Sequence, residues 1–322
     1  MRMFRIVSTV LLLLVFHSGI AQDKAAAKVS FVSVKTNAPQ NNPLKVYYRI
    51  PAKYKEDSKK LYRVLVIFGG RNCSGENEVG MLGFDKWADG NDVFLVGPGF
   101  KDDEYWQPEK WSGKALLEAI GEIGKSYRIS KEHLLYYGYS AGSQCSNLFP
   151  AWKPQICTAW VSHACGVFHK PDKKMKTCPG LVTCGEADMG RYQISRNFVT
   201  GSRKLGVPLV WKTFPNTQHD VPPDSVMLAK VFLKYYHTEN ISDLESGKKE
   251  TARRKTPERK ILYVGDDQEN RFWPAGSREI QNIEIEDRVE FASKELAEAW
   301  GQAAKPRIAV SVAETDFTKV KK

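Results

Sequence analysis

The sequence predicts an α/β fold with a mostly parallel central sheet, helices on both of its faces, and a small C-terminal extension. Short apolar runs typical of buried strands alternate with longer helical stretches between about residues 28 and 237. Glycines and polar side chains come directly after several of these runs, as expected at strand ends. The chain has 322 residues, of which 42% are hydrophobic, so it can hold one large core and an extra piece.

Residues 1–21 are typical of a secretory signal. A basic start with Arg2 and Arg5 precedes the largely apolar stretch 6–16, and small residues lead to an expected cleavage after Ala21. The apolar run is too short to favour a spanning helix, and no other stretch is long enough to span a membrane. No cysteine lies near the cleavage point, which argues against a lipid anchor. The sequence therefore predicts a secreted or periplasmic protein.

The elements of the main domain, residues 22–240, are expected in this order. Alternating side chains predict strands at 29–34 and 44–50. Further strands are expected at 62–68, 92–97, 133–138, 157–162, 180–184 and 207–214, with helices at 113–127, 141–149, 190–205 and 224–237. Sites in parallel sheets of this kind lie beyond the carboxyl ends of the strands.

The charged stretch 241–260 is expected to be a linker. Residues 248–260 hold seven basic side chains and two acidic ones, without interleaved aromatic residues, which indicates a solvated segment and no nucleic-acid site. Weak attraction to an acidic polysaccharide or a membrane surface is the alternative. The net charge of the whole chain is +11, and loss of the two arginines of the signal lowers it to +9.

Residues 261–322 form an extension of unknown role. A strand is expected at 260–265, alternation at 283–285 suggests another, and a helix is expected at 293–300 with Ser293 as its N-cap. So short a segment can bury little surface alone. This favours packing on the main core over a separate accessory module.

One motif stands at the end of the strand expected at 133–138. The sequence Gly138-Tyr139-Ser140-Ala141-Gly142 is a G-x-S-x-G turn between this strand and the following helix. Small residues allow the sharp bend, and the bend makes the serine hydroxyl project above the sheet. Ser140 is therefore a candidate nucleophile.

A serine nucleophile needs a base and a third group that orients the base. His219 follows the strand at 207–214, and Asp188 follows the strand at 180–184, so both are placed at the same sheet edge as Ser140. Histidine suits the role of base because its unperturbed pKa is near neutrality. A turn serine, a loop histidine and an aspartate after a strand are each often structural, but together they point to nucleophilic catalysis.

With these residues in this chain order, residues 28–237 resemble the α/β-hydrolase family. Secreted polyhydroxyalkanoate depolymerases and feruloyl or acetyl-xylan esterases are the most similar members. The resemblance implies a serine carboxylic ester hydrolase with Ser140, Asp188 and His219 as its catalytic triad, and without cofactor or metal. It also favours Asp188 over Glu186, because the family pattern places the acid shortly after a glycine.

Other residues compete for these roles. His163 and His169 precede Asp188, which is the wrong order, and Asp220 is too close to His219 to orient its ring. His237, at the end of a predicted helix, is interpreted as a surface residue, and His133 is expected at the opposite sheet edge.

An acyl-transfer site also needs hydrogen-bond donors for the oxyanion. Ala141, directly after the nucleophile, is expected to supply one through its backbone N–H. The other is expected after the strand at 62–68, from Gly70 or Arg71. Relatives commonly have His-Gly at this turn, whereas this chain has Phe68-Gly69-Gly70-Arg71. The alternative is that Gly69-Gly70 forms an ordinary turn without a part in catalysis.

The chain has six cysteines, at 73, 145, 157, 165, 178 and 184, and all of them follow the expected cleavage point. Export would place them in an oxidising compartment. They predict up to three disulfides, with Cys165 and Cys184 as a possible pair, and free buried thiols as the alternative. No Cys/His cluster suggests zinc.

An ester-bearing small molecule, polysaccharide or polyester is the expected substrate. A platform for a sugar or a phenolic group is one interpretation of Trp87, Tyr105, Trp106 and Trp111, and ordinary packing is the other. A serine peptidase with the same triad, and a non-catalytic hydrolase fold that binds a glycan, are the alternative functions. The sequence does not indicate an oligomeric state.

Overall fold

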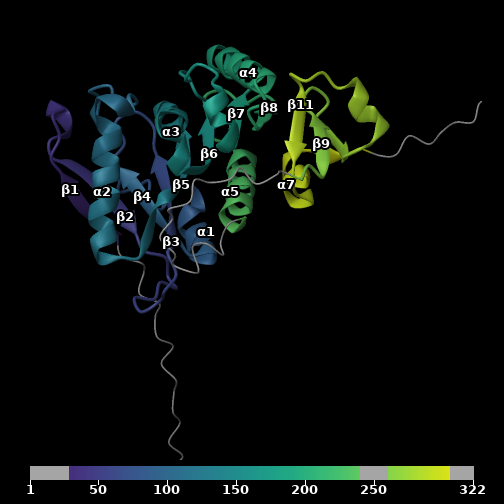
Figure 1. Ribbon diagram of the computed structural model, residues 1–322. Coiled ribbons are helices and arrows are strands. Elements are labelled where there is room, and N and C mark those ends of the chain that lie inside the picture. The colour runs from purple at the N-terminus through teal and green to yellow at the C-terminus, as the bar shows by residue number, and fades with distance from the viewer. Residues whose placement is uncertain (1–28, 240–259, 305–322) are drawn as a thin grey trace, which may run out of the picture.

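The structure is a computed structural model that describes residues 29–239 and 260–304 (Figure 1). The predicted signal peptide, and the predicted linker apart from residue 260, lie outside the described residues, as do residues 305–322. No helix in the described ranges is long and apolar enough to cross a bilayer.

An eight-stranded sheet forms the centre of the molecule, in the order β1-β2-β4-β3-β5-β6-β7-β8. Its strands are β1 (Val29–Val34), β2 (Leu44–Arg49), β3 (Tyr62–Phe68), β4 (Val93–Pro98), β5 (Ile129–Tyr139), β6 (Cys157–His163), β7 (Gly180–Gly185) and β8 (Leu209–Phe214). The pairs β1–β2 and β2–β4 are antiparallel, and all the other neighbours are parallel. The predicted, mostly parallel sheet is confirmed.

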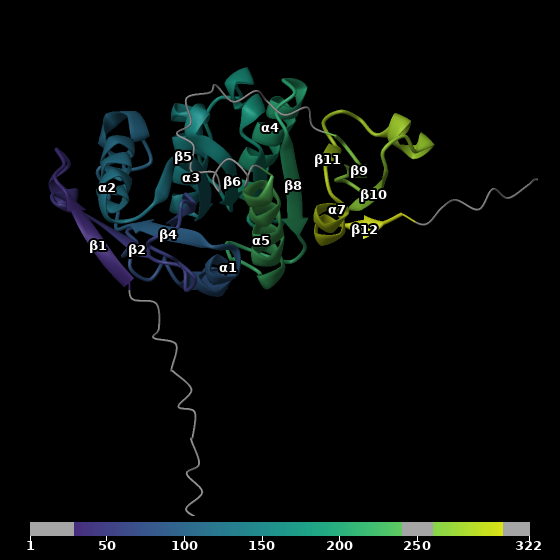
Figure 2. The same cartoon turned by 60° about the horizontal axis from the view of Figure 1, so that its bottom comes forward.

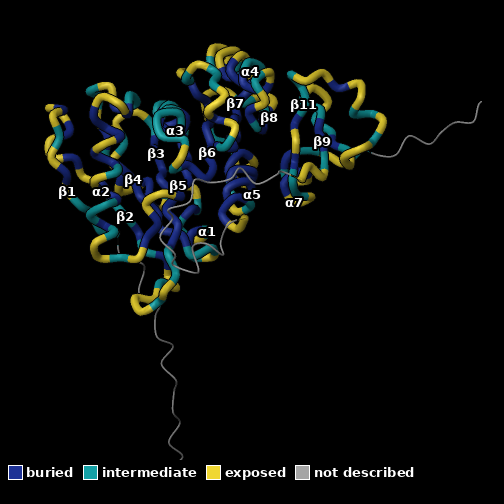
Figure 3. The backbone as a smooth tube through the Cα atoms, viewed as in Figure 1, coloured by how far each residue is buried: buried dark blue, intermediate teal, exposed yellow. Residues whose placement is uncertain are grey.

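Helices cover both faces of this sheet (Figures 1 and 3). The helices are α1 (Phe84–Asn91), α2 (Gly113–Ser126), α3 (Ala141–Trp152), α4 (Met189–Lys204) and α5 (Pro223–Thr238). Strand β3 is buried along its whole length, because Val64, Val66 and Phe68 face α2, α3 and α4, whereas Leu65 and Ile67 face α1 and α5. Continuous apolar runs of this kind are characteristic of strands covered on both sides.

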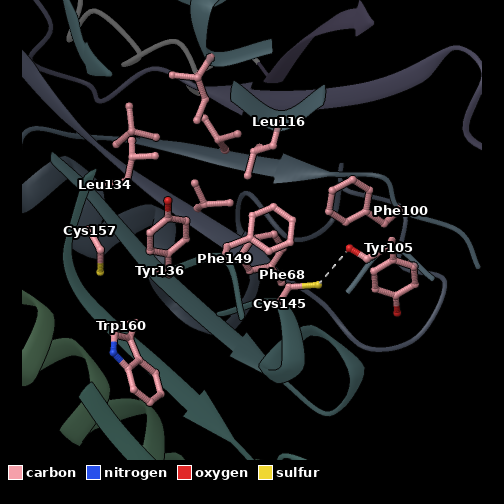
Figure 4. Packing of buried hydrophobic residues seen from close by; sticks show 14 of the residues in the cluster. Phe68, Phe100, Tyr105, Leu116, Leu134, Tyr136, Cys145, Phe149, Cys157 and Trp160 are labelled. Carbon is pink, nitrogen blue, oxygen red and sulfur yellow. Dashed lines mark hydrogen bonds between the residues drawn. The ribbon is translucent and has the colours of Figure 1, made fainter. Parts of the chain in front are cut away.

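Two of the expected platform aromatics belong to the core, and Figure 4 shows one of them, Tyr105, beside Phe100. Tyr105 and Trp111 are 2% and 7% exposed, and both pack against the buried ring of Phe100. Trp87 donates its indole N–H to the carbonyl of Lys230 on α5. Trp106 is half-buried like Trp87, and it packs against the core cluster of Tyr105 and Trp111, with its ring 5.3 Å from that of Tyr105. Ordinary packing, the alternative interpretation, therefore accounts for these aromatics.

The C-terminal extension is a four-stranded sheet in the order β11-β9-β10-β12, with one helix. Its elements are β9 (Tyr263–Asp266), β10 (Arg271–Pro274), β11 (Arg288–Phe291), α7 (Lys294–Trp300) and β12 (Gln302–Ala303). The strand predicted at 260–265 is confirmed as β9. The Ser293 N-cap is confirmed too, since Ser293 Oγ accepts from Leu296 N at 3.1 Å. The strand suggested at 283–285 is wrong: Ile283 and Ile285 lie between a short 3-10 helix and β11.

This extension packs beside β8 and α5 (Figure 2). Phe272, Val289 and Trp300 belong to the same buried apolar cluster as Val210 of β8 and Phe232 of α5. The cluster therefore runs from the main core into the extension without a break.

Charged groups join the extension to α4. Arg196 donates to Asp267 at 2.9 Å and also pairs with Asp287, and Arg203 pairs with Asp267. The Asp267 side chain is only 2% exposed. Burying a carboxylate is costly unless it is paired, and here two arginines compensate it.

His237 is not the surface residue that was predicted. It is 2% exposed on the inner side of α5, because the C-terminal turn of this helix packs against the central sheet. Helix α1 was not predicted either. Its sequence contains glycine and aspartate residues that weaken the helical signal, and left-handed residues bound it on both sides.

The expected disulfides are absent from the structure: all six cysteines lie within the described ranges, and none of them forms a disulfide there. The thiols of Cys165 and Cys178 each donate to a backbone carbonyl at 3.0 Å, to Val167 and Pro154 respectively. Five of the six cysteines are buried. They behave as small core residues, and the alternative interpretation as buried thiols holds.

Candidate active site

Ser140 occupies a sharp turn between β5 and α3. Its φ of 54° and ψ of −124° are unfavourable for a residue with a side chain, so the surroundings must hold the bend. Its backbone N–H donates to the carbonyl of His163 at 3.0 Å. A Cβ on Gly138 would lie 2.2 Å from the Gly142 carbonyl, and one on Gly142 would lie 2.1 Å from the Gly69 carbonyl. Only glycine fits these two positions, which explains the motif.

The three predicted partners lie in one hydrogen-bonded chain. Ser140 Oγ is 2.9 Å from His219 Nε2, and His219 Nδ1 is 2.8 Å from Asp188 Oδ2. The carboxylate can only accept, so Nδ1 carries the proton and Nε2 is left to accept the serine hydroxyl proton. This arrangement is the one that a serine nucleophile and its histidine base require.

The structure separates Asp188 from its competitor Glu186. Asp188 lies between β7 and α4, is 8% exposed, and also accepts from Arg191 Nη1 at 3.1 Å. Glu186 is exposed and accepts from Thr213 Oγ1 at 2.7 Å, on the other side of the loop. Only Asp188 contacts His219.

Comparison with known proteins identifies the fold of the chain. No protein-family model and no curated protein matches the sequence. A ferulic acid esterase of the anaerobic fungus Anaeromyces mucronatus has a similar structure, with a TM-score of 0.51 and 15% identity over 69% of this chain and 91% of its own. A fluorophosphonate-binding serine hydrolase of Staphylococcus aureus has a TM-score of 0.52 and 10% identity over 66% and 99% of the two chains.

A third solved structure is similar over a smaller part of its length. It is a candidate dipeptidyl aminopeptidase IV of Bacteroides ovatus, with a TM-score of 0.52 and 13% identity over 65% of this chain and 35% of its own. The chain has the α/β-hydrolase fold. At these identities the likeness concerns the fold of the α/β-hydrolase and leaves its reaction to be argued from the site.

His163 has a structural part that the sequence did not indicate. It is 1% exposed at the end of β6, and burial lowers its pKa below the ordinary value. Its Nε2 donates to the Asp220 carbonyl at 2.6 Å, and Nδ1 lies 2.7 Å from Thr183 Oγ1. The His163 carbonyl accepts from the N–H of Ser140, and the His163 ring contacts Asp220 next to His219. His163 therefore connects the nucleophile turn to the loop of His219. Its position at the carboxyl end of a predicted strand was the available signal.

The predicted oxyanion donors lie at the start of α3 and after the end of β3. Ala141 is the first residue of α3, so its N–H has no carbonyl one turn earlier in the helix to bind. Gly70 lies against Tyr139, since a Cβ there would be 3.4 Å from the tyrosine hydroxyl oxygen. The Arg71 side chain is 73% exposed and pairs with Asp102 at 3.1 Å. Ala141, with Gly70 or Arg71, remains a prediction.

Apolar and positively charged groups are exposed at the carboxyl ends of β6 and β7. Val167 lies in the loop after β6, and Met189, the first residue of α4, follows Asp188 directly in the chain. Arg191, which contacts Asp188, has a side chain that is 41% exposed. Substrate at this site would therefore meet both an apolar surface and a guanidinium group.

Proposed function

We propose that this α/β-hydrolase is a serine hydrolase that cleaves carboxylic esters through an acyl-enzyme on Ser140. The observation that carries the proposal is the unbroken chain of 2.9 Å and 2.8 Å contacts from Ser140 through His219 to Asp188. The strained backbone at Ser140 supports it, because such strain concentrates at functional sites.

The reaction follows from this geometry. Ser140 Oγ attacks the ester carbonyl while His219 Nε2 takes the hydroxyl proton, and buried Asp188 stabilises the imidazolium that forms. The oxyanion of the tetrahedral intermediate accepts hydrogen bonds from the N–H of Ala141 and from the second donor, Gly70 or Arg71. Collapse expels the alcohol with the proton from His219. A water molecule, activated in the same way, then hydrolyses the acyl-enzyme and restores Ser140.

Polysaccharide side groups or a polyester are the substrates that we infer. The resemblance in fold to a ferulic acid esterase and the exposed apolar groups Val167 and Met189 support a bulky ester. Export, inferred from residues 1–21, would bring the enzyme to such polymers.

A serine peptidase is the second candidate function. The same triad hydrolyses amides, and the fold likeness to a candidate dipeptidyl aminopeptidase IV supports this alternative. A non-catalytic glycan-binding fold fits less well, because it would have no need of the contacts between Ser140, His219 and Asp188.

A parallel assay tests the proposal. The protein without residues 1–21 is offered short p-nitrophenyl esters, acetylated xylan, feruloylated sugar and small peptides. We expect hydrolysis of esters and little of peptides, and the reverse preference would favour the peptidase.

The variant Ser140→Ala should lower kcat on the best ester by several orders of magnitude, because the triad acts as a unit. A fluorophosphonate probe should label Ser140 in the unmodified protein. A well-folded Ser140→Ala protein with near-normal turnover, or labelling of another serine, would contradict the mechanism.

A further inference from the structure

An open space lies beside Gly166, in the loop after β6, between two nitrogen donors of the candidate active site. A Cβ on Gly166 would lie 3.9 Å from Gln144 Nε2 and 4.0 Å from Arg191 Nε. Within the described ranges no other atom, apart from the neighbours of Gly166 in the chain, lies within 4 Å of that point. The two donors thus converge on a volume that a side chain at 166 would fill.

Both donors belong to elements that carry the proposed triad. Gln144 is on α3 four residues after Ser140, which places it one turn along the same face of the helix. Arg191 is in the first turn of α4 and donates to Asp188 through Nη1. A group bound beside Gly166 would therefore sit next to the reacting ester.

The structure gives neither donor a partner in this space. Among the hydrogen bonds of the described residues, the Gln144 side chain makes none, and Arg191 uses Nη1 alone. All three residues at the space are half-buried, so a ligand there would be partly shielded from water. A basic residue in the first turn of a helix also opposes the helix dipole, so its placement calls for anionic partners. Asp188 is one such partner, and the free Nε faces the space.

We propose that Gln144, Gly166 and Arg191 form a subsite that binds a carboxylate group of the ester substrate. A guanidinium and an amide N–H are both donors, and a carboxylate accepts from both at once. The inference rests on the proposed ester hydrolysis and adds a substrate class to it: esters whose acyl or alcohol part carries a second, free carboxylate.

The charge of Arg191 is shared between Asp188 and this space, because Arg191 donates to Asp188 through Nη1 alone. Proton transfer to His219 adds one positive charge to the site and forms one oxyanion at the same time, so the net charge near the subsite is unchanged by the reaction. The subsite is therefore expected to attract the carboxylate equally in the ground state and in the transition state. Binding of this kind lowers KM and thereby raises kcat/KM.

Two matched pairs of esters test the proposal. On the alcohol side, 3-carboxyphenyl acetate is compared with 3-carbamoylphenyl acetate; on the acyl side, monomethyl succinate is compared with methyl succinamate. Each pair replaces a carboxylate with a neutral amide of the same shape. We expect a ratio of kcat/KM of roughly 10 or more in favour of the carboxylate in at least one pair at pH 7 and low salt. The ratio should fall in high salt.

Two variants and a control locate the preference. Gly166→Ala should bring the ratio close to one, because the methyl group fills the space. Its folding is not at risk, since the φ of Gly166 lies outside the left-handed region and the new contacts are ordinary. Arg191→Gln should also bring the ratio close to one, whatever it does to the absolute rates. Lys114→Gln removes the same charge from an exposed position of α2 and should leave the ratio unchanged.

The possible outcomes separate the subsite from the proposed function. Hydrolysis of the neutral esters with a ratio near one in both pairs would overturn the subsite and leave ester hydrolysis intact. A preference that persists in both Gly166→Ala and Arg191→Gln would overturn it as well. Failure to hydrolyse any ester, charged or neutral, would contradict the proposed function itself.

Discussion

Each residue of the candidate site lies directly after the end of a strand or in the loop that follows it. Ser140, Asp188 and His219 follow β5, β7 and β8, and the sheet brings these three ends to one edge. His163 follows β6, between them, and touches both the nucleophile turn and the loop of His219. The parallel arrangement of the strands therefore explains why residues 79 positions apart, Ser140 and His219, lie within hydrogen-bond distance.

The first prediction at this scale concerns the acid. Asp188→Asn should leave a folded protein whose His219 is poorly held in the active tautomer, so kcat should fall by ~10⁴-fold, as in other serine triads. Glu186→Gln removes the neighbouring carboxylate, which contacts Thr213 and not the histidine, and should have a mild effect. Steady-state kinetics on one soluble ester measure both. If Glu186→Gln proved the more damaging change, the acid would have to be reassigned.

At the scale of elements, edge strand β8 is the point where the two sheets meet. An edge strand presents unpaired backbone groups. Here Trp300 Nε1 of α7 donates to the Trp211 carbonyl of β8 at 2.6 Å, and both side chains are buried. Gly265 permits this, because a Cβ there would lie 2.7 Å from the Trp300 ring. The extension therefore covers an edge that would otherwise be open.

Trp300→Phe tests this contact. Loss of the indole N–H leaves a buried carbonyl without its donor, and the smaller ring leaves a void, so the free energy of unfolding should fall by about 2–3 kcal/mol. Trp273→Phe makes the same chemical change on β10 at a half-buried position and should cost less. Denaturant unfolding of the two variants compares them. Equal losses would mean that the Trp300 hydrogen bond adds little.

Helix α5 contributes a dependence of stability on pH. Burial, with the nearby charges of Arg63 and Lys60, lowers the pKa of His237 to about 4. In the unfolded chain the imidazole takes a proton below about pH 6.5, whereas in the folded chain it stays neutral to about pH 4. Stability should therefore decrease as pH falls through this window, by about 3 kcal/mol in total.

The variant His237→Gln isolates this contribution. Its melting temperature should depend less steeply on pH between 6.5 and 4 than that of the unmodified protein. His163 and His169, whose pKa values are also lowered by burial, keep part of the slope in both proteins. Identical slopes in the two melting series would exclude His237 as a source of the acid sensitivity.

The strands and the three candidate residues were predictable because local signals specify them. Buried parallel strands have continuous apolar runs, and the glycines of the Ser140 turn are required by backbone contacts of 2.1 and 2.2 Å. The burial of His237 and the paired roles of Arg203 and Asp267 were not predictable, because they depend on which distant elements pack together. The cysteines were misinterpreted because their spacing says nothing about the direction of the thiols, two of which point at carbonyls.

At the scale of the whole molecule, the extension and the main domain share one core. Apolar contacts through Trp300, the buried pair Arg203–Asp267 and the cover over β8 all join them. Helix α4 contacts both the candidate site and the extension. Arg191 in its first turn binds Asp188, and Arg196 and Arg203 further along bind Asp267 of the extension. The extension thus braces the helix that begins beside the proposed catalytic acid.

Truncation after Glu239 tests whether this bracing matters. The shortened chain keeps Ser140, Asp188 and His219 but loses Trp300, which covers the edge of β8. It also loses Asp267, the carboxylate that pairs with Arg203, so the buried charge of this arginine would stand uncompensated. We expect aggregation, or a melting temperature at least several degrees lower, together with reduced kcat on a small soluble ester. Truncation after Ala304 is the matched control, because it keeps the whole four-stranded sheet and should preserve both properties. If the protein ending at Glu239 instead kept its stability and its small-ester activity, the extension would be an accessory module. In that case its loss should appear only as lower activity on an insoluble polymer.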